Sequence, residues 1–303
     1  MTENREPLVS IIIPVYNGEN YVAQAIDSAL AQTYKNIEIV VVNDGSADKT
    51  GEICRSYGDK IRYFEKENGG CASALNYAIK EAKGTFISWL SHDDLYFPYK
   101  IRYQLSLYEK KHLDANNTIV AGNGGTIDGK GNRVFHPCFR KKGLLTPLAA
   151  FKTLLFGKCF AGCSLLIPRS IFTDNDLWFD ESKKFLLDYE MWMKMTRAGY
   201  SVYQDTKKVS LGRYHAAQVS HKLKHLHLIE EKMIMEDFLA STEDPAFLEQ
   251  VYYWIKISDQ TIPQADRVLE KIRIRKPVLL LHTGKRKLRN AVKRLYHRVV
   301  KRK

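Results

Sequence analysis

VSIIIPVYNG, at residues 9–18, is the stretch that decides the fold of this chain. Five of the seven residues in 9–15 are β-branched, and such a run is typical of a strand that is covered on both faces. Similar runs follow at 37–42, 61–64 and 85–90, with helical patterns between them at 21–31, 49–57 and 72–82. This alternation predicts right-handed βαβ units, and therefore an α/β fold with a mostly parallel sheet and helices on both of its faces.

The remainder of the chain is less regular. Its apolar patterns predict strands at 119–127 and 133–139 around the Gly-rich turn 128–131, then a strand at 164–168 and a helix at 185–198. Beyond residue 221 the pattern is wholly helical, with candidate helices near 221–240, 245–258 and 263–274. We therefore predict an α/β domain over residues 1–220 and a helical C-terminal region over residues 221–303.

Polar clusters stand where each of the first four predicted strands ends. They are Pro14–Gly18, Asn43–Ser46, Glu67–Gly70 and Ser91–Asp94. Because the carboxyl ends of parallel strands meet at one edge of a sheet, the four clusters predict a single pocket there. Asp44 could accept a hydrogen bond from a uracil N–H or a ribose hydroxyl. Asp44 and Asn17 could instead cap the helices that follow them.

Asp93 and Asp94 indicate a site for a divalent cation. Adjacent carboxylates repel each other, and hard oxygen ligands suit Mg²⁺ or Mn²⁺, which complete their shell with waters and substrate phosphates. Such a cation would stabilise the charge on a departing diphosphate. The alternative is a solvated turn that caps the helix beginning near Pro98.

Taken together, these segments resemble the inverting glycosyltransferases of family 2, which have the GT-A fold. The resemblance covers about residues 7–220 and rests on VSIIIPVYN (9–17), VNDGS (42–46), NGGCASALN (68–76), WLSHDD (89–94) and LDYEMW (187–192). It implies a nucleotide-sugar donor, with UDP the foremost nucleotide and dTDP or GDP as alternatives.

The resemblance also implies roles for single residues. The nucleoside would be held by Pro14, Tyr16 and Asp44. The donor site would be lined by Asn68 and Gly70, and Asn17 and Ser73 of the same motifs join this predicted donor-binding set. The cation would be bound by Asp93 and Asp94. Two positions depart from the family pattern, because Ser91 replaces the first aspartate of Asp-x-Asp-Asp and Leu187 replaces the glutamate of a Glu-Asp pair.

Asp188 is a lone carboxylate at the start of a helical pattern rich in Met and Trp. By resemblance it is the general base that takes the proton from an acceptor hydroxyl. The oxygen would then attack the anomeric carbon opposite the diphosphate and invert its configuration. A salt bridge to a neighbouring cation such as Lys184 is the structural alternative.

A second predicted part of the site is the segment 213–220, which resembles the family's loop closing over the donor. Arg213 would neutralise charge, His215 would reach a phosphate or the metal, and Gln218 would contact the donor. A lid that excludes water suits a transferase, because water is the competing acceptor. An ordinary surface histidine is the alternative for His215.

The net charge of +13 is concentrated at one end of the chain. Of the 47 basic residues, 14 lie within 271–303, which holds no acidic residue, so 33 basic and 34 acidic residues remain elsewhere. Residues 284–303 form a cationic pattern with a narrow apolar stripe, which favours contact with an anionic membrane surface. A solvated end, a helix packed on the body, or nucleic-acid binding are alternatives, the last weakened by the scarcity of stacking aromatics.

Other features bear on the compartment and the partners. No apolar run approaches the roughly 20 residues that span a bilayer. Residues 1–7 lack the pattern of a secretory signal. The five cysteines form no CxxC pair and predict no disulfides. We therefore expect a cytoplasmic protein, possible contact with the inner face of the membrane, and a glycan, glycolipid or glycoprotein acceptor of bacterial-type surface polysaccharide synthesis. A non-catalytic nucleotide-binding scaffold is the alternative from another class.

Overall fold

The computed structural model describes residues 6–134, 142–155, 160–216, 218, 223–241 and 247. The chain divides into two compact units, Met1–Glu230 and Glu231–Lys303. The predicted boundary at residue 220 stays a prediction, because residues 219–222 lie outside the described part. The predicted helices at 245–258 and 263–274 and the cationic segment 284–303 also lie outside it, apart from residue 247.

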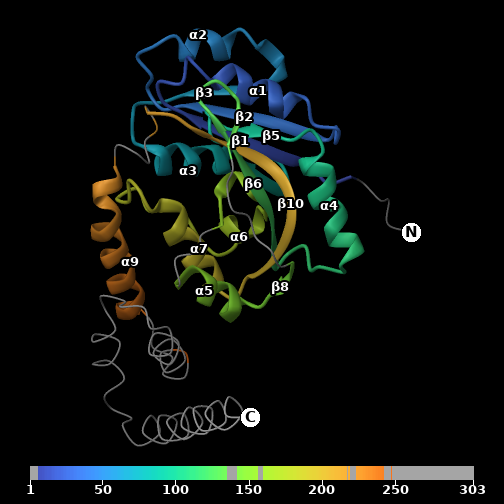
Figure 1. The fold of residues 1–303 in the computed structure, drawn as a ribbon, viewed down its shortest axis with the longest axis vertical. Helices are drawn as coiled ribbons and strands as arrows, with labels where there is room; N and C mark the ends of the chain where they lie inside the picture. Colours follow the sequence, from blue (N-terminus) through green and yellow to red (C-terminus); the bar gives the residue numbers. More distant parts are fainter. Residues whose placement is uncertain are drawn as a thin grey trace, which may run out of the picture. The chain divides into compact units, whose positions relative to one another are not determined.

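Four parallel strands form the first half of the sheet, in the order β3-β2-β1-β4. They are β1 (Val9–Val15), β2 (Ile37–Asn43), β3 (Arg62–Glu65) and β4 (Phe86–Trp89). The connecting helices are α1 (Val22–Leu30), α2 (Thr50–Arg55) and α3 (Cys71–Glu81). Figure 1 shows α1 and α2 on one side of these strands and α3 on the other. The predicted α/β class with helices on both faces is confirmed.

The second half of the sheet is mixed. After β4 the order continues β9-β6-β10-β5. Among these neighbours, β6 and β10 pair in parallel, and the other pairs are antiparallel. These strands are β9 (Leu165–Pro168), β6 (Thr118–Asp128), β10 (Ser201–Tyr214) and β5 (Leu95–Tyr96). Two short strands join them: β7 (Arg133–Val134) pairs with β6, and β8 (Gly143–Leu145) pairs with β10. The parallel arrangement predicted from the first four strands therefore does not extend to the whole sheet.

The longest strand, β10, was not predicted. Its pairing with β6 shifts register between Gln204 and Lys208 and again before Ser210, so the alternation of buried and exposed side chains is interrupted. The remaining described helices are α4 (Lys100–Lys110), α5 (Pro147–Leu155), α6 (Ser170–Thr173), α7 (Leu187–Arg197) and α9 (His227–Ser241). Among these described helices, none is long and apolar enough to cross a membrane.

Burial explains why the first strands form. All seven residues of β1 are buried, and five of the seven in β2 are buried as well. Helix α3 packs on β1 and β2, with Ala72, Ala74 and Ala78 among its buried residues, and these small side chains allow a close approach to the sheet. Each fully buried Val or Ile stabilises the fold by about 1.5–3 kcal/mol.

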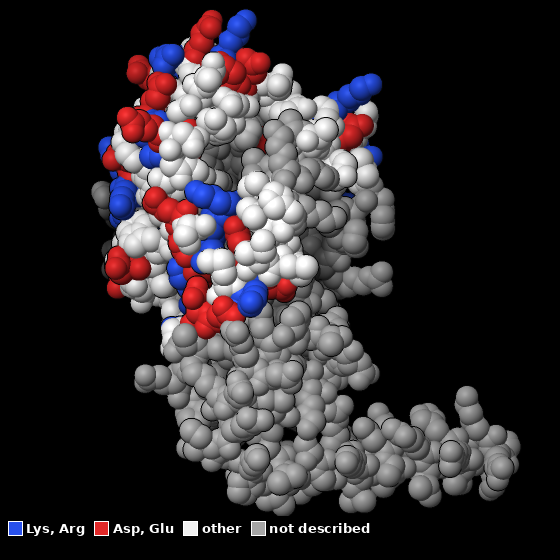
Figure 2. Space-filling view, turned by 90° about the vertical axis from the view of Figure 1, so that its left-hand side faces the viewer, with Lys and Arg blue, Asp and Glu red and all other residues white. Residues whose placement is uncertain are grey.

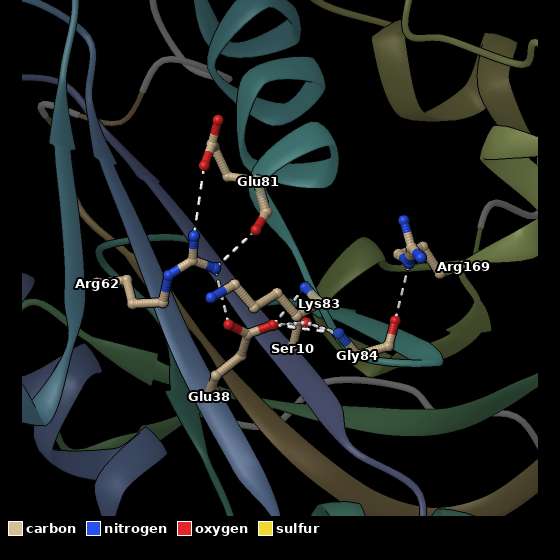
Figure 3. A network of polar contacts seen from close by, with 7 residues as sticks. All are labelled: Ser10, Glu38, Arg62, Glu81, Lys83, Gly84 and Arg169. Atoms are coloured by element: carbon tan, nitrogen blue, oxygen red, sulfur yellow. Dashed lines mark hydrogen bonds and ion pairs between the residues drawn. The ribbon is translucent and has the colours of Figure 1, made fainter.

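A polar network fixes the amino ends of the parallel strands (Figure 3). The Glu38 carboxylate accepts hydrogen bonds from the Ser10 hydroxyl at 2.5 Å, the Lys83 N–H at 2.5 Å and the Arg62 guanidinium at 2.8 Å. The N–H of Gly84, just before β4, donates to the Ser10 hydroxyl at 2.9 Å. Burial raises the pKa of Glu38, but these hydrogen bonds outweigh it and hold the pKa below its usual range. One carboxylate thus joins four strands at the edge opposite their carboxyl ends.

Lys100, at the start of α4, is fully buried in the core. Its ammonium donates to the Ser88 hydroxyl at 2.9 Å, the Gln104 side-chain oxygen at 2.6 Å and the Leu165 carbonyl at 2.9 Å. The Tyr96 ring lies 4.6 Å from Nζ. These partners are neutral, and burial lowers the pKa of Lys100 to about 7.

Lys100 should therefore make the stability of the fold depend on pH. The unfolded lysine keeps its proton up to about pH 10, whereas the folded one loses it above about pH 7. Between these values the unfolded state binds more protons, so the unfolding free energy should rise with pH, by up to about 1.4 kcal/mol per unit. Urea unfolding from pH 7 to 9 measures this slope. Lys100→Met should remove this pH dependence, whereas Lys60→Met, at an exposed lysine, should retain it. Equal slopes in the wild type and both variants would refute the assignment of the pH dependence to Lys100.

Candidate active site

The predicted strand-end clusters line one cavity of about 440 Å³. It lies at the carboxyl ends of β1, β2 and β4 and at the start of α7. The predicted site residues that line it are Pro14, Tyr16, Asp44, Asn68, Gly70, Asp93, Asp94, Asp188 and Gln218. Four others lie outside its wall, namely Asn17, Ser73, Arg213 and His215. The structure therefore brings Asp44, Asp93 and Asp188 around a shared cavity, as the sequence motifs predicted.

Asp44 holds the loop between β3 and α3 against the end of β2. Its nearly buried carboxylate accepts the N–H groups of Gly69 at 3.0 Å and Gly70 at 2.7 Å, and the Lys66 ammonium at 2.7 Å. The next residue, Gly45, has a φ of +73°, and a Cβ there would stand 2.8 Å from the Asn68 nitrogen. The capping alternative for Asp44 is wrong, because α2 begins only at Thr50.

Asn17 and Ser73 do not line the cavity but make contacts beside it. The Asn17 side-chain oxygen accepts the N–H of Ala47 at 2.9 Å, and its own N–H donates to the Ser46 hydroxyl at 2.9 Å. Asn17 thus links the ends of β1 and β2, and it does not cap α1, which begins at Val22. Ser73 lies against Gly69, where an added Cβ would be 2.7 Å from the Ser73 hydroxyl oxygen.

The two adjacent carboxylates have different partners. Asp94 accepts the Cys163 thiol at 3.0 Å and the N–H of Arg213 at 2.8 Å. Burial and the neighbouring charge of Asp93 raise the pKa of Asp94 to about 7. Asp93 lies instead 3.1 Å from His215, measured from its Oδ2 to the ring Nε2. Of the two carboxylates, Asp93 is thus the one whose oxygen meets an imidazole nitrogen, whereas Asp94 meets a thiol.

A divalent cation fits this arrangement in part. The Asp93 oxygen and the His215 nitrogen are both metal ligands, and Mg²⁺ or Mn²⁺ takes its other ligands from waters and phosphates. Within the described part of the chain, no group of three or more His, Cys, Asp or Glu side chains is arranged around a metal position. Asp93 and His215 would hold the cation, and waters and substrate phosphates would complete its shell.

Arg213 braces the site from β10. It is 3% exposed, and its guanidinium donates to the Asp93 carbonyl at 2.8 Å and to the Gln24 side-chain oxygen at 2.8 Å. The Tyr21 ring lies beneath it, 4.5 Å from the guanidinium carbon. The predicted closing segment is described only in part, because residues 217 and 219–222 lie outside the described residues. Of that segment, Gln218 reaches the cavity wall.

Helix α7 carries Asp188 to the cavity. Its apolar face is buried through Met191, Met195 and Trp192, whose indole N–H donates to the Phe160 carbonyl at 3.0 Å. This packing fixes the first turn, where the Asp188 carboxylate accepts the N–H of Tyr189 at 2.7 Å.

Cys71 lies in the same cavity wall as the three predicted carboxylates. It opens α3 and lines the cavity. Desolvation and the negative charges of Asp188, Asp44 and Asp93 raise the pKa of the Cys71 thiol to about 12.

Several cavity residues were missed by sequence reasoning. They include Cys71, Trp89, His92, Glu181, Lys183, Lys184 and Phe185. Lys183 is paired with Asp180 at 3.1 Å, whereas the Lys184 ammonium lies 3.3 Å from the Glu181 carbonyl. The signal that could have found the lysines is their position directly before the 187–192 motif. Lys184 had been considered only as a structural partner of Asp188.

Charged side chains of both signs lie side by side on the face of the described part shown in Figure 2. This mixture agrees with the nearly balanced charge outside residues 271–303. The body therefore carries no extended basic surface on this face.

Solved structures place the fold among known proteins. The crystal structure of S. aureus TarS in complex with UDP-GlcNAc matches with a TM-score of 0.59, over 87% of this chain and 71% of that chain. Sequence identity is 19%, so the likeness concerns the fold, which is the GT-A fold. The sheet, with its cavity at the carboxyl ends of the parallel strands, therefore places this protein in the class of GT-A folds.

Sequence comparison identifies the family. Glycosyl transferase family 2 matches residues 10–174, and the chain belongs to this family. An uncharacterized glycosyltransferase of Rickettsia typhi is 52% identical over 216 residues, 71% of this chain and 66% of that protein. Another, of Rickettsia felis, is 44% identical over 290 residues, 88% of this chain and 47% of that protein. The chain spans between 31% and 66% of the length of such relatives.

Proposed function

We propose that this protein transfers a sugar from a UDP-sugar to a hydroxyl group of a glycan, glycolipid or glycoprotein, with inversion at the anomeric carbon. The observation that carries the proposal is the single cavity that Asp44, Asp93 and Asp188 line together. Membership of family 2 supports the reaction class, and the UDP-GlcNAc complex of TarS supports the choice of nucleotide.

The donor would bind along the strand ends. Pro14, Tyr16 and the loop held by Asp44 would surround the nucleoside, and Tyr16, 48% exposed, offers a ring for stacking on the base. Asn68 and Gly70 would lie beside the sugar and phosphates. Asp93 and His215 would hold Mn²⁺ or Mg²⁺, which would neutralise charge on the departing diphosphate. Lys184, in the wall of the same cavity, would add a positive charge that also stabilises the departing diphosphate.

Asp188 would act as the general base. The reaction breaks the bond between the anomeric carbon and the diphosphate oxygen and forms a bond to the acceptor oxygen, whose proton passes to the Asp188 carboxylate. Attack from the side opposite the leaving group inverts the configuration. Exclusion of bulk water from the cavity would favour transfer, because water would otherwise compete as the acceptor.

The cellular setting is part of the same proposal. A cytoplasmic enzyme whose residues 284–303 lie on an anionic membrane surface would meet acceptors that are presented there. A surface-polysaccharide acceptor would be consistent with this arrangement. Vesicles with and without anionic lipid test it, since binding of the full chain only to anionic vesicles is expected, and equal binding to neutral ones would refute it.

The function is tested by calorimetric titration of UDP with and without Mn²⁺, followed by a screen of nucleotide sugars for release of the nucleoside diphosphate. We expect UDP binding that Mn²⁺ strengthens, and turnover of at least one UDP-sugar. Nucleotide binding without turnover of any donor would favour a scaffold. Absence of UDP affinity, together with salt-dependent binding to oligonucleotides, would favour the nucleic-acid alternative.

A further inference from the structure

Glu230, in the first turn of α9, is a nearly buried carboxylate, 5% exposed, that lies outside every motif of the sequence. It accepts four hydrogen bonds from three consecutive backbone N–H groups. Oε1 accepts the N–H of Lys184 at 2.7 Å and that of Phe185 at 3.2 Å. Oε2 accepts the N–H of Phe185 at 3.0 Å and that of Leu186 at 2.7 Å. The family match ends at residue 174, well before this residue.

These three N–H groups directly precede α7, which begins at Leu187. Lys184 and Phe185 precede the helix and Leu186 is its N-cap residue, so the three N–H groups have no acceptor within the helix and lie beside the partial positive charge of its first turn. A carboxylate supplied from a distant part of the chain satisfies both needs, through charge-assisted hydrogen bonds. The Glu230 carboxylate therefore fixes the backbone of the turn that leads into α7.

The same turn places two charged side chains in the cavity wall: Lys184 at its start and Asp188 just after it. Lys184 lines the wall, and its ammonium is 3.4 Å from the position that a Cβ on Gly70 would take. Asp188 lines the wall in the first turn of the helix. Both residues lie within two positions of an N–H group that Glu230 holds. A small displacement of this turn would shift both at once.

We infer that Glu230 is a positioning residue for catalysis: by binding the N–H groups of residues 184–186 it sets where Asp188 and Lys184 stand in the cavity. This inference rests on the proposed function in one respect, namely that Asp188 is the general base. Glu230 itself does not line the cavity.

Glu230→Gln keeps the size of the side chain but replaces one accepting oxygen by an NH₂ group that faces N–H donors. Donor hydrolysis by the full chain, with water as acceptor, should show a kcat lower by about 10²-fold, because displacements near 1 Å can cost this much. The Kd for UDP should rise by less than about tenfold, well below the change in kcat, because Lys184 moves with the turn while the proposed nucleoside contacts at the strand ends stay in place. Glu52→Gln, an exposed glutamate in the first turn of α2, is the matched control and should keep wild-type kcat.

A double-mutant cycle separates positioning from a merely structural role. In the background of Asp188→Asn, Glu230→Gln should lower the residual kcat of the folded protein much less than it does in the wild type, because the base, one of the two groups it positions, is gone. Equal fractional losses in both backgrounds, or a loss explained by the folded fraction in a thermal melt, would overturn the inference. Glu230→Asp, which keeps the charge, should recover part of the rate.

Hydrogen exchange tests the contact without any substrate. The amides of residues 184–186 should be protected in the wild type and exchange at least about tenfold faster in Glu230→Gln, with Glu52→Gln unchanged. Unchanged exchange in Glu230→Gln would refute the inference even if the enzyme proved active. Conversely, if the wild type turned over no donor, the proposed function would fail while this measurement still decided whether Glu230 holds the turn.

Discussion

Asp188→Asn is expected to lower the rate of sugar transfer by about 10²- to 10⁴-fold, the range typical of a general base. Asparagine has nearly the same shape but does not accept the proton of the attacking hydroxyl. The affinity for UDP should change by less than about threefold, because Asp188 lies on α7 and the proposed nucleoside contacts lie at the ends of β1 and β2. Initial rates with a UDP-sugar and calorimetric titration of UDP measure the two quantities.

The control for this change is Asp59→Asn, at an exposed aspartate in the short turn before β3 that does not line the cavity. It should behave as the wild type in both assays. A wild-type transfer rate in Asp188→Asn would remove the general-base assignment. A parallel loss of UDP affinity would instead indicate that Asp188 contributes to donor binding.

Asp93→Asn is expected to abolish the strengthening of UDP binding by Mn²⁺ and to lower kcat/KM by about 10²- to 10³-fold, as for the loss of one preorganised contact to developing charge. The reason is geometric, because the Asp93 oxygen stands 3.1 Å from the His215 ring nitrogen and lines the cavity. His215→Ala should weaken the Mn²⁺ effect in the same direction. Titration of UDP at several Mn²⁺ concentrations measures it.

Asp94 provides the neighbouring comparison. Its two oxygens face the Cys163 thiol and the Arg213 N–H, so Asp94→Asn should act mainly on stability and retain more of the Mn²⁺ effect than Asp93→Asn. If the two substitutions had equal effects on Mn²⁺ dependence, both carboxylates would have to meet the cation. If neither altered it, the metal site would lie elsewhere or be absent from the reaction.

The parallel half of the fold was predictable because its strands are covered on both faces. Burial on both sides demands continuous apolar runs, which is why 9–15 and 37–42 stand out in the sequence. Strand β10 has no such pattern, because two register shifts surround the exposed pair Lys207 and Lys208. Each register shift interrupts the alternation of buried and exposed side chains, so β10 lacks the two-residue sequence period that would predict a strand.

The candidate site was predictable to the level of segments rather than atoms. The motifs identified which strand ends meet, since the topology of a parallel sheet brings them to one edge. They did not separate Asp93 from Asp94, which are alike in sequence and differ only in what lies beside them. Nor did they indicate Lys100 or Glu230, because an ordinary lysine or glutamate in a helical pattern carries no sign of burial.

The network around Glu38 has a consequence for redesign. Because β1, β2, β3 and the start of β4 are tied together at their amino ends, their alignment has support that is separate from the loops at the other end. Segments that follow the strands could therefore be exchanged with those of relatives, changing which sugar is accepted, while the framework keeps its register. The network that ties the strands together and the loops that are proposed to bind the donor thus lie at opposite ends of the same strands.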